Sequence, residues 1–413
     1  MLYVDRERLA ARFSEMAAIG ATGRGGVHRL ALSDADRQAR DLLATWCRQR
    51  DFDLEVDAVG NMFATRVGRS PETPPFLIGS HLDSQPYAGA YDGPVGVLCA
   101  LEVLESLDDL GIETRQSVQL VNWTNEEGAR FRPPLVGSAV FAGVYDLEFA
   151  LNCRDVEDMR LGDELRRIDY SGARQPGWPV SGYVEVHIEQ GIVLESKGQV
   201  IGAVTGVVGI RDLQVTVIGE DTHAGPKEMA SRRDALVGAA DMILDANRLG
   251  LECAPDARVT VGRISVPSDS HSVVPGLAKF TLDLRHPTAM GLASLEAAAR
   301  ERFEKIAHQR NLEVRFEPVF DYPPVMFDAS LLDEIRSAAQ GVGHLAVDLP
   351  SRAGHDAWNM ARIAPAAMIF IPCRDGISHN ESEFAEFEHI AAAADVLLNT
   401  VTSLTKAVDS HQR

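Results

Sequence analysis

The sequence predicts an α/β fold with a second, α+β domain inserted into it. Three observations support this interpretation. The chain has 413 residues, more than one hydrophobic core usually serves, so two domains are expected. Between residues 75 and 123 the apolar pattern changes from strand to helix and back to strand, the order of a β-α-β unit. After Gly209 the order becomes β-α-β-β-α-β, which is typical of a ferredoxin-like domain.

The first domain has a helix expected over residues 34 to 50. Ser33 is placed to cap this helix, and apolar side chains then recur at helical spacing, namely Ala39, Leu42, Leu43 and Trp46. Two β-rich runs, Pro75 to Ile78 and Val118 to Trp123, enclose a helix from about Val95 to Leu110. Because functional residues gather where the strands of such sheets end, we expect the loops after both strands to face one crevice.

The inserted domain is expected over residues 209–325, which leaves 1–208 and 326–413 for the first domain. The segments after Pro323 again carry polar loops that the first half needs for a site. A small sheet with an exposed edge often pairs with a second copy, so this domain is a candidate for dimerisation. Its predicted strands are Ile210 to Ile218, Arg258 to Val266, Leu277 to Leu284 and Glu313 to Phe316, and its predicted helices are Met229 to Leu249 and Leu292 to His308.

Composition excludes several partners. Sixty acidic and forty basic residues give a formal charge of -20, which repels nucleic acid and anionic lipid surfaces. The first residues lack the apolar core of a signal peptide, and no later apolar run approaches the roughly 20 residues of a membrane span. We therefore expect a cytoplasmic protein that binds neither nucleic acid nor membrane. Five scattered cysteines, never in a C-x-x-C pair, argue against disulfides and an all-cysteine zinc site.

Polar clusters stand out in the expected loops. They contain His81 with Asp83, Asp92, Glu126 with Glu127, His187 with Gln190, and Ser378 with His379. Taken alone, each has an ordinary structural explanation. An aspartate followed by glycine and proline, as at Asp92, is the pattern of a helix N-cap. Adjacent glutamates suit an exposed acidic turn, and a single histidine beside apolar residues is usually a satisfied, partly buried side chain.

Together, the clusters favour a metal centre. Three histidines, an aspartate and a glutamate are the nitrogen and oxygen ligands that zinc accepts. Asp83, two residues after His81, suits a carboxylate that accepts the second ring N–H and orients the ring. Two ions about 4 Å apart need a bridging carboxylate, which Asp92 can supply while it begins its helix. One of Glu126 and Glu127 can bind metal while the other transfers protons. The residue types alone do not decide between a metal centre and separate structural roles for these residues.

Longer motifs extend the pattern beyond these clusters. The segments GSHLDSQPYAGAYDGPVGV, TNEEGARF, HIEQG, THAG, LDLR and DGISHNESE follow one another in the order found in the hydantoinase/carbamoylase family of amidases. The sequence resembles this family from Gly25 to Glu383. The resemblance implies a catalytic domain like that of the di-zinc aminopeptidases, an inserted domain that serves as lid and dimerisation domain of a homodimer, and two divalent metal ions in each subunit.

The resemblance also implies the metal ligands. His81 and His187 would hold one ion, Glu127 and His379 would hold the other, and Asp92 would bridge the two. Zinc, manganese, cobalt and nickel all accept these ligands, so the sequence does not select the metal.

Four further residues acquire roles from the resemblance. Glu126 would be the general base, and His223 of the THAG motif would reach the partner subunit's site and stabilise the oxyanion. Gln190 and Arg285 match positions that hold the substrate, with the arginine taking a carboxylate in a forked geometry. Without the family pattern, His223 would be interpreted as a turn histidine and Arg285 as a surface arginine.

The chain departs from the family pattern at positions that face the substrate. Ser272 stands where an asparagine usually binds the substrate carboxylate, so a water or His271 would have to take over that contact. The loop before His355 reads Ser-Arg-Ala-Gly, and we expect its Arg352 and Gly354 to lie near the substrate. A solvated surface arginine at position 352 is the alternative. These changes leave the metal ligands intact and bear on specificity.

The activity implied by the resemblance is hydrolysis of the C–N amide bond of an N-carbamoyl-L-amino acid, which releases the amino acid, ammonia and carbon dioxide. In this mechanism the metal ions activate a water, and Glu126 takes its proton and returns it to the leaving nitrogen. Allantoate and N-acyl amino acids are alternative substrates, since they also carry a carboxylate and an amide or ureido group. An inactive, metal-stabilised binding protein is the alternative from another class, against which the presence of both Glu126 and His223 argues.

Overall fold

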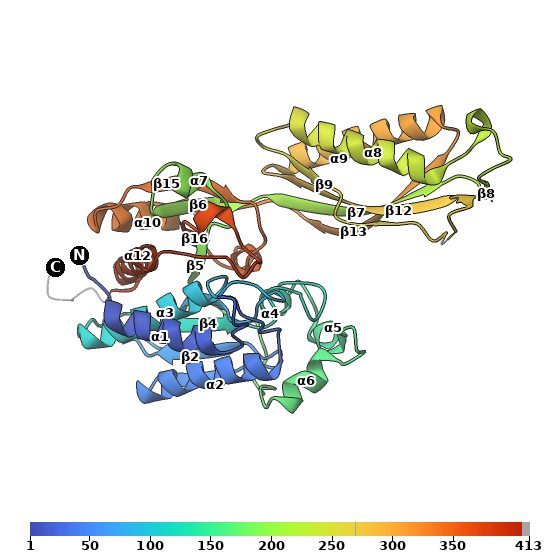
Figure 1. Cartoon of the computed structure of the whole chain (residues 1–413). Coiled ribbons are helices and arrows are strands. Elements are labelled where there is room, and N and C mark those ends of the chain that lie inside the picture. Colours follow the sequence, from blue (N-terminus) through green and yellow to red (C-terminus); the bar gives the residue numbers. More distant parts are fainter. Residues whose placement is uncertain (269, 407–413) are drawn as a thin grey trace. The chain divides into compact units, whose positions relative to one another are not determined.

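The structure is a computed structural model that describes residues 1–268 and 270–406 (Figure 1). The chain divides into two compact units. Unit 1 combines Met1–Gly206 with the segment that begins at Met326, and unit 2 comprises Val207–Val325. Residues 407–413, which the sequence analysis assigned to the first domain, lie outside the described residues.

Unit 1 is built on a mixed sheet with the strand order β1-β2-β4-β3-β5-β16-β6-β14, and β15 pairs with β6. In its centre, β3 runs parallel to β4 and β5, and β16 runs parallel to β5. These parallel strands therefore end at one edge of the sheet. The strands are β1 Asp53–Val56, β2 Met62–Arg66, β3 Phe76–His81, β4 Val118–Trp123, β5 Gly182–Ile188, β6 Ile201–Val207, β14 Val325–Met326, β15 Ala346–Ser351 and β16 Ala366–Ile371.

Helix α3 connects β3 to β4 and is buried along nearly its whole length, because it packs between the sheet and the helices α1 and α12. The predicted β-α-β unit is thus confirmed, as is the helix that Ser33 caps by accepting the N–H of Asp36 at 3.2 Å. The helices of unit 1 are α1 Arg6–Ala18, α2 Asp34–Gln49, α3 Pro94–Asp109, α4 Val136–Phe141, α5 Leu147–Asn152, α6 Leu161–Arg167, α7 Val193–Ser196, α10 Ala329–Gly341, α11 Asp356–Met360 and α12 Phe387–Thr405, with a 3-10 turn at Arg374–Gly376.

Unit 2 is an antiparallel sheet in the order β10-β12-β7-β13, with β9 also paired to β12. Helices α8 and α9 cover the same face of this sheet (Figure 1). Alternate strand residues such as Leu213, Val215 and Val217 of β7 meet the helices in a separate core. Its elements are β7 Gly209–Ile218, β8 Thr222–His223, α8 Ala235–Glu252, β9 Arg258–Thr260, β10 Ile264–Ser265, β11 Val273–Val274, β12 Leu277–His286, α9 Ala289–Gln309 and β13 Glu313–Tyr322, with a 3-10 turn at Met229–Ser231.

Three predicted elements of unit 2 have different bounds. The helix expected from Met229 begins at Ala235, because the side chain of Asp234 caps it by accepting the N–H of Val237 at 3.1 Å. The single strand expected from Arg258 is divided into β9 and β10. The last strand continues past Phe316 to Tyr322, since it pairs with β7 along most of its length.

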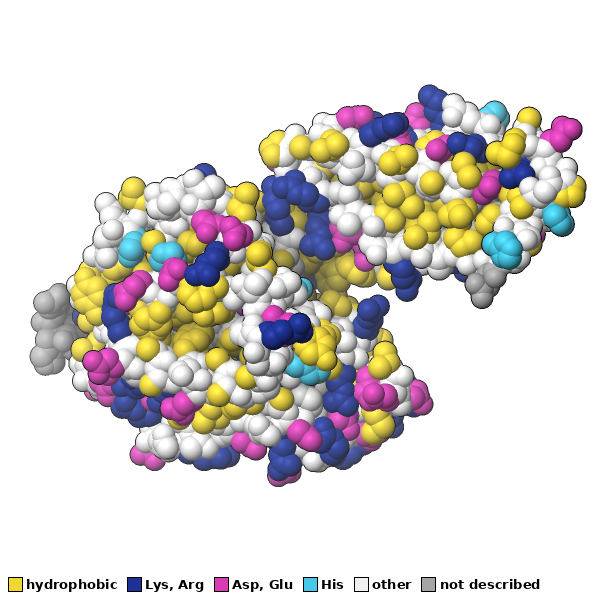
Figure 2. Space-filling model, in the orientation of Figure 1, with side chains coloured by type: hydrophobic (Ala, Val, Ile, Leu, Met, Phe, Trp, Pro, Cys, Tyr) yellow, Lys and Arg dark blue, Asp and Glu magenta, His cyan; other side chains and the backbone are white. Residues whose placement is uncertain are grey.

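Helix α8 also exposes an apolar stripe. Val237, Leu244 and Leu251 recur every seven residues on its outer side and are 41%, 59% and 70% exposed. Figure 2 shows hydrophobic side chains gathered on this unit. None of the helices in the described part of the chain combines the length and the hydropathy needed to cross a membrane.

Candidate active site

The parallel strands of unit 1 bring the predicted site residues to one edge of the sheet. His81 is the last residue of β3, which runs beyond the predicted end at Ile78, and His187 lies near the end of β5. Glu126 and Glu127 follow β4, the strand on the other side of β3. The loops after strands that are far apart in the sequence therefore converge, as expected for this kind of sheet.

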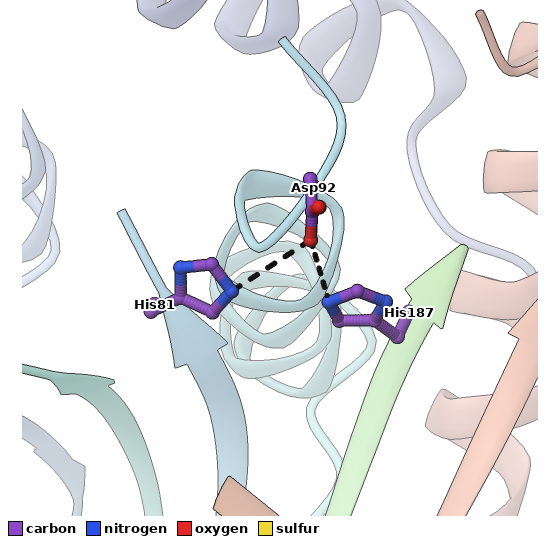
Figure 3. A group of neighbouring side chains, drawn as sticks. All are labelled: His81, Asp92 and His187. Atoms are coloured by element: carbon purple, nitrogen blue, oxygen red, sulfur yellow. Dashed lines mark ion pairs between the residues drawn. The ribbon is translucent and has the colours of Figure 1, made fainter. Parts of the chain in front are cut away.

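His81, Asp92 and His187 form a first donor group (Figure 3). The two histidine rings point towards each other from β3 and β5, and the Asp92 carboxylate lies between them. The Nε2 atoms of His187 and His81 lie 3.0 and 3.9 Å from Oδ1 of Asp92. All three side chains are buried, with exposures of 3% or less. This group fits one tetrahedral cation with nitrogen and oxygen ligands.

Asp92, Glu127 and His379 form a second donor group. The Nε2 atom of His379 lies 3.2 Å from Oδ2 of Asp92 and 3.5 Å from Oε2 of Glu127. Gln85 holds the carboxylate of Glu127 in place, since its backbone N–H and its side-chain amide donate to that carboxylate at 3.1 and 2.9 Å. Asp92 thus presents one oxygen to each donor group, which is the arrangement that a bridging carboxylate requires.

Asp92 does not cap helix α3, and this part of its expected role was wrong. The N-cap is Gly93, without a side-chain cap. The carboxylate of Asp92 is instead engaged by the histidines and by the side chains of Gln190 and Ser378, which both donate to Oδ2 at 2.8 Å. Gly93 has a φ of 87°, and a Cβ there would lie 2.5 Å from the His81 ring. Only glycine allows the chain to pass this close to the first donor group.

The orientation of His81 also differs in detail from the prediction. Its Nδ1 bonds to the main-chain carbonyl of Asp83 at 2.8 Å, whereas the Asp83 carboxylate lies 3.8 Å away. That carboxylate instead accepts the backbone N–H groups of Glu126 and Glu127, both at 3.2 Å, and so holds the turn after β4. His187 uses the same device, with Nδ1 on the carbonyl of Ile188 at 2.9 Å. In both rings a carbonyl partner places the proton on Nδ1 and the lone pair on Nε2.

The donor atoms fit metal ions. The Nε2 atom of His81 is buried and has no hydrogen-bond partner among the residues that the structure describes, which is costly for a polar atom unless a ligand completes it. In His187, the lone pair on Nε2 faces a carboxylate oxygen, a contact that needs a proton or a cation between them. Imidazole nitrogens and carboxylate oxygens are ligands that zinc and similar divalent ions accept.

Glu126 lies beside these groups without belonging to either. Its Oε2 atom is 3.5 Å from Nε2 of His81, and its side chain is largely buried. Burial, together with the charges of Asp356 and Glu127, raises the pKa of Glu126 well above its usual range. The adjacent glutamates therefore point to different partners, and Glu126 is able to hold and pass on a proton.

Burial and contacts between the site residues also shift the pKa values of the other titratable groups. Burial raises the pKa of Glu127 to about 8 and lowers that of His81 to about 4. Burial also lowers the pKa of His187, but its hydrogen bond with Asp92 and the charges of Asp92 and Glu185 together outweigh this and raise the pKa to about 9. The contact with Asp92 likewise raises the pKa of His379 to about 9. In the protein without metal, His187 and His379 are therefore the histidines that carry positive charge beside the acidic residues.

Of the predicted substrate residues of unit 1, Gln190 contacts this centre directly. It donates through Nε2 to Asp92 and to Ser378, and its Oε1 atom is buried without a hydrogen-bond partner among the described residues. Arg352 and Gly354 are half-buried in the loop between β15 and α11. The next residue, His355, packs its ring at 4.4 Å from that of His187. The loop therefore reaches the first donor group through a residue that was not predicted to belong to the site.

The remaining predicted residues lie in unit 2. His223 is exposed on β8, which pairs with β11 so that His223 lies opposite Val273. His271 and Ser272 come directly before β11 and are exposed, and the carbonyl of Ser272 accepts the N–H of Ala224 at 2.8 Å. Arg285 on β12 is paired with Asp283 at 2.9 Å. The structure brings His223 and Ser272 together, with Arg285 on another strand of the unit.

Sequence reasoning missed several buried acids that hold the site. Glu185 accepts the Ser80 hydroxyl at 2.7 Å and the N–H of Ala357 at 3.0 Å, so it joins β3, β5 and α11. Glu383 accepts the N–H of Asp92 at 3.1 Å. Glu383 stands in the same short loop as His379. This proximity in the sequence was the feature that could have indicated its role. Glu185 lies inside an apolar strand and gave no signal.

Comparisons with known proteins agree with this geometry. Residues 77–403 match the peptidase family M20/M25/M40. The chain is 40% identical over 407 residues to the N-carbamoyl-L-amino-acid amidohydrolase of Rhizobium meliloti, and the match covers 98% of each chain. It is 31% identical over 433 residues to the allantoate deiminase of Arabidopsis thaliana, covering 96% of this chain and 82% of that protein.

A solved structure is similar over the whole chain. The crystal structure of an amidase of the hydantoinase/carbamoylase family from Burkholderia multivorans has a TM-score of 0.90 and 46% identity, and the match covers 97% of this chain and 98% of that one. The mixed α/β fold and the paired donor groups are typical of a metal-dependent hydrolase. The chain belongs to peptidase family M20/M25/M40 and, within it, to the hydantoinase/carbamoylase amidases.

The raised pKa values of His187 and His379 predict that the stability of the metal-free protein depends on pH. In protein stripped of metal with a chelator, His187 and His379 hold protons at a pH where the unfolded chain has lost them. Their contribution to stability is therefore complete below pH 6.5, the ordinary histidine value, and is lost as the pH rises through about 9. The raised pKa of Glu127 acts with the same sign. We expect the melting temperature of the stripped protein to fall over this range.

The control is the double variant His187→Gln with His379→Gln, which should show a shallower fall than the wild type under the same conditions. A melting temperature of the stripped wild type that stays constant between pH 6.5 and 9 would contradict the assignment of these shifts.

Proposed function

We propose that the protein hydrolyses the C–N amide bond of an N-carbamoyl-L-amino acid, a bond other than a peptide bond, and releases the amino acid, ammonia and carbon dioxide. The observation that carries this proposal is the shared carboxylate of Asp92, with one donor group at each oxygen and Glu126 beside them. The 40% identity to an enzyme named for this reaction supports the choice of substrate.

Two divalent ions are the proposed cofactors. His81 and His187 would hold one, Glu127 and His379 the other, with Asp92 shared between them. When bound, the ions supply positive charge that lowers the pKa of a water and polarises the carbonyl group of the substrate. Zinc, manganese, cobalt and nickel suit the same donors.

Glu126 is the proposed proton carrier. Its carboxylate would remove a proton from the attacking water and deliver it to the leaving nitrogen, because an amide nitrogen leaves readily only after protonation. Oε1 of Gln190 is buried and has no donor among the described residues, and in this proposal it would accept an N–H of the ureido group. His223 would donate to the oxyanion, and Arg285 would bind the substrate carboxylate.

Allantoate is the second candidate substrate. It carries the same two recognition groups, a carboxylate and a ureido nitrogen, and the relative from Arabidopsis thaliana is named for it. N-acyl amino acids are a third class, since Arg352 and Ser272 depart from the family pattern near the substrate.

The choice of substrate is tested with a panel of N-carbamoyl-L-amino acids, allantoate and N-acyl amino acids. After reconstitution with each metal, we expect ammonia release from N-carbamoyl-L-amino acids to exceed that from allantoate, and no cleavage of N-acyl amino acids at a comparable rate. Faster turnover of allantoate would replace the substrate and keep the reaction class. Binding of ureides without ammonia release from any of them would favour a binding protein.

Glu126 and Glu127 provide a matched pair for testing the proposed roles. Glu126→Gln should retain bound metal and lose turnover by about 10²–10⁴-fold, the usual contribution of a general acid–base. Glu127→Gln should lose metal from the second donor group. Metal content by mass spectrometry and kcat on the same preparations separate the two. Full turnover by metal-loaded Glu126→Gln protein would refute its assignment as the base.

The proposed assembly is a homodimer in which unit 2 acts as lid and dimerisation domain. The stripe Val237, Leu244 and Leu251 on α8 supports it, because apolar side chains repeated along one exposed helix face usually pack against a partner. His223 is exposed in the same unit. We propose that it completes the site of the partner subunit.

The proposed dimer is tested first by measuring the molecular mass of the protein in solution. Leu244→Glu should give monomers in size-exclusion chromatography with light scattering, because the charge would be buried at the interface. Met290→Glu is the control, since Met290 is 81% exposed at the start of α9 and lies off the stripe. Dimeric Leu244→Glu protein would place the interface elsewhere.

Shared catalysis is tested by mixing. His223→Ala and Glu126→Gln should each be inactive as homodimers. After subunit exchange, a heterodimer has one site with an intact Glu126 and an intact His223 from the other subunit, so activity should return. If verified heterodimers remain inactive, His223 does not act across the interface.

A further inference from the structure

Glu383 occupies an unusual position for an acidic residue. It lies in the loop between the 3-10 turn Arg374–Gly376 and α12, and its side chain is only 3% exposed. Burial raises the pKa of Glu383 to about 7, and the charge of Asp92 acts in the same direction. An apolar side chain would avoid both costs. The hydrogen bonds that Glu383 makes must therefore explain its place.

Those hydrogen bonds join two loops of the site. One carboxylate oxygen of Glu383 accepts the backbone N–H groups of Tyr91 and Asp92, both at 3.1 Å. The other oxygen lies 2.9 Å from the hydroxyl of Ser378. The same hydroxyl lies 2.8 Å from Oδ2 of Asp92. Glu383 thus contacts the main chain of Asp92 directly and its carboxylate through Ser378.

The surrounding chain leaves room for this carboxylate. A Cβ on Gly89 would lie 2.1 Å from Oε1 of Glu383, so the loop before Asp92 approaches the acid as closely as glycine allows. On the other side, Ser378 directly precedes His379, the histidine of the second donor group. Glu383 is therefore the point at which the loop that carries Asp92 meets the loop that carries His379.

We propose that Glu383 is a positioning residue that sets Asp92 and His379 at the separation needed for metal binding. It does not touch the substrate, and it acts through the N–H of Asp92 and the hydroxyl of Ser378. This inference rests on the proposed function, because it takes Asp92 as the bridging ligand. Residues that orient metal ligands commonly contribute about 10- to 100-fold to metal affinity, and we expect an effect of that size.

The test compares three variants. Glu383→Leu keeps most of the volume and removes both acceptors, so it should bind the second ion about 10- to 100-fold more weakly. Glu383→Gln keeps one acceptor for the two backbone N–H groups, and its amide can donate to Ser378, so it should restore affinity to near the wild-type value. Asp395→Leu is the control, because Asp395 is also buried and accepts a backbone N–H, from Val4 at 2.8 Å, away from the site.

Metal affinity of the chelator-treated protein, measured by competition with a chromophoric chelator for zinc and for manganese, is the primary readout. Melting temperature and circular dichroism verify folding, and kcat and KM follow at saturating metal. A merely structural role would lower the melting temperature of Glu383→Leu and Asp395→Leu alike and leave both with wild-type metal affinity. That result would overturn the proposal. Equal loss of affinity in Glu383→Leu and Glu383→Gln would also overturn it, because charge rather than geometry would then matter.

Two further variants complete the design. If Glu383→Leu does not fold, Ser378→Ala removes the hydroxyl that lies between Glu383 and Asp92 and should weaken metal binding, and unchanged affinity there would count against the proposal. Asp92→Ala separates this inference from the proposed function. If Asp92→Ala binds metal like the wild type, the metal site itself is wrong. If Asp92→Ala loses metal while Glu383→Leu retains it, only the role of Glu383 is wrong.

Discussion

Burying a carboxylate is costly unless donors and opposite charges surround it, and the site of unit 1 is arranged around this requirement at Asp92. Its two oxygens face His187 and His379 at 3.0 and 3.2 Å, and Gln190 and Ser378 donate to it at 2.8 Å. These four partners come from β5, from the turn after it and from the loop before α12. Asp92 therefore joins one strand of the sheet to two loops that are distant from each other in the sequence.

Main-chain amides hold the other acids near the site. Asp83 accepts the N–H groups of Glu126 and Glu127, and Glu127 accepts that of Gln85. Glu383 accepts the N–H of Asp92. Main-chain carbonyls orient the rings of His81 and His187 through Nδ1, so their Nε2 atoms are directed at Asp92. The backbone thus assembles a concentration of negative charge that divalent cations can neutralise, and it does so with main-chain N–H groups from loops that are distant in the sequence.

Much of this arrangement could be predicted from the sequence. The β-α-β unit was visible because its strands and helix have clear apolar periods, and the motif order indicated the family. The contacts that individual atoms of the site make could not be predicted in the same way. Asp92 has the sequence pattern of an N-cap, yet Gly93 takes that place because the histidines engage the carboxylate. Asp83 orients His81 through its carbonyl, and sequence patterns describe side chains only. Glu383 acts through a contact with a loop 290 or so positions earlier in the chain, which local patterns do not encode.

One residue that departs from the family pattern, Ser272, lies in unit 2, beside elements that also carry a proposed catalytic residue. Ser272 accepts the N–H of Ala224 through its main-chain carbonyl, so a change of side chain at this position leaves the pairing of β8 with β11, and hence the placement of His223, intact. Substrate preference can therefore vary at position 272 without moving the proposed oxyanion donor. Arg285 differs, because it is already paired with Asp283 at 2.9 Å. In the proposed role of Arg285, the substrate carboxylate would therefore have to share the guanidinium group with Asp283.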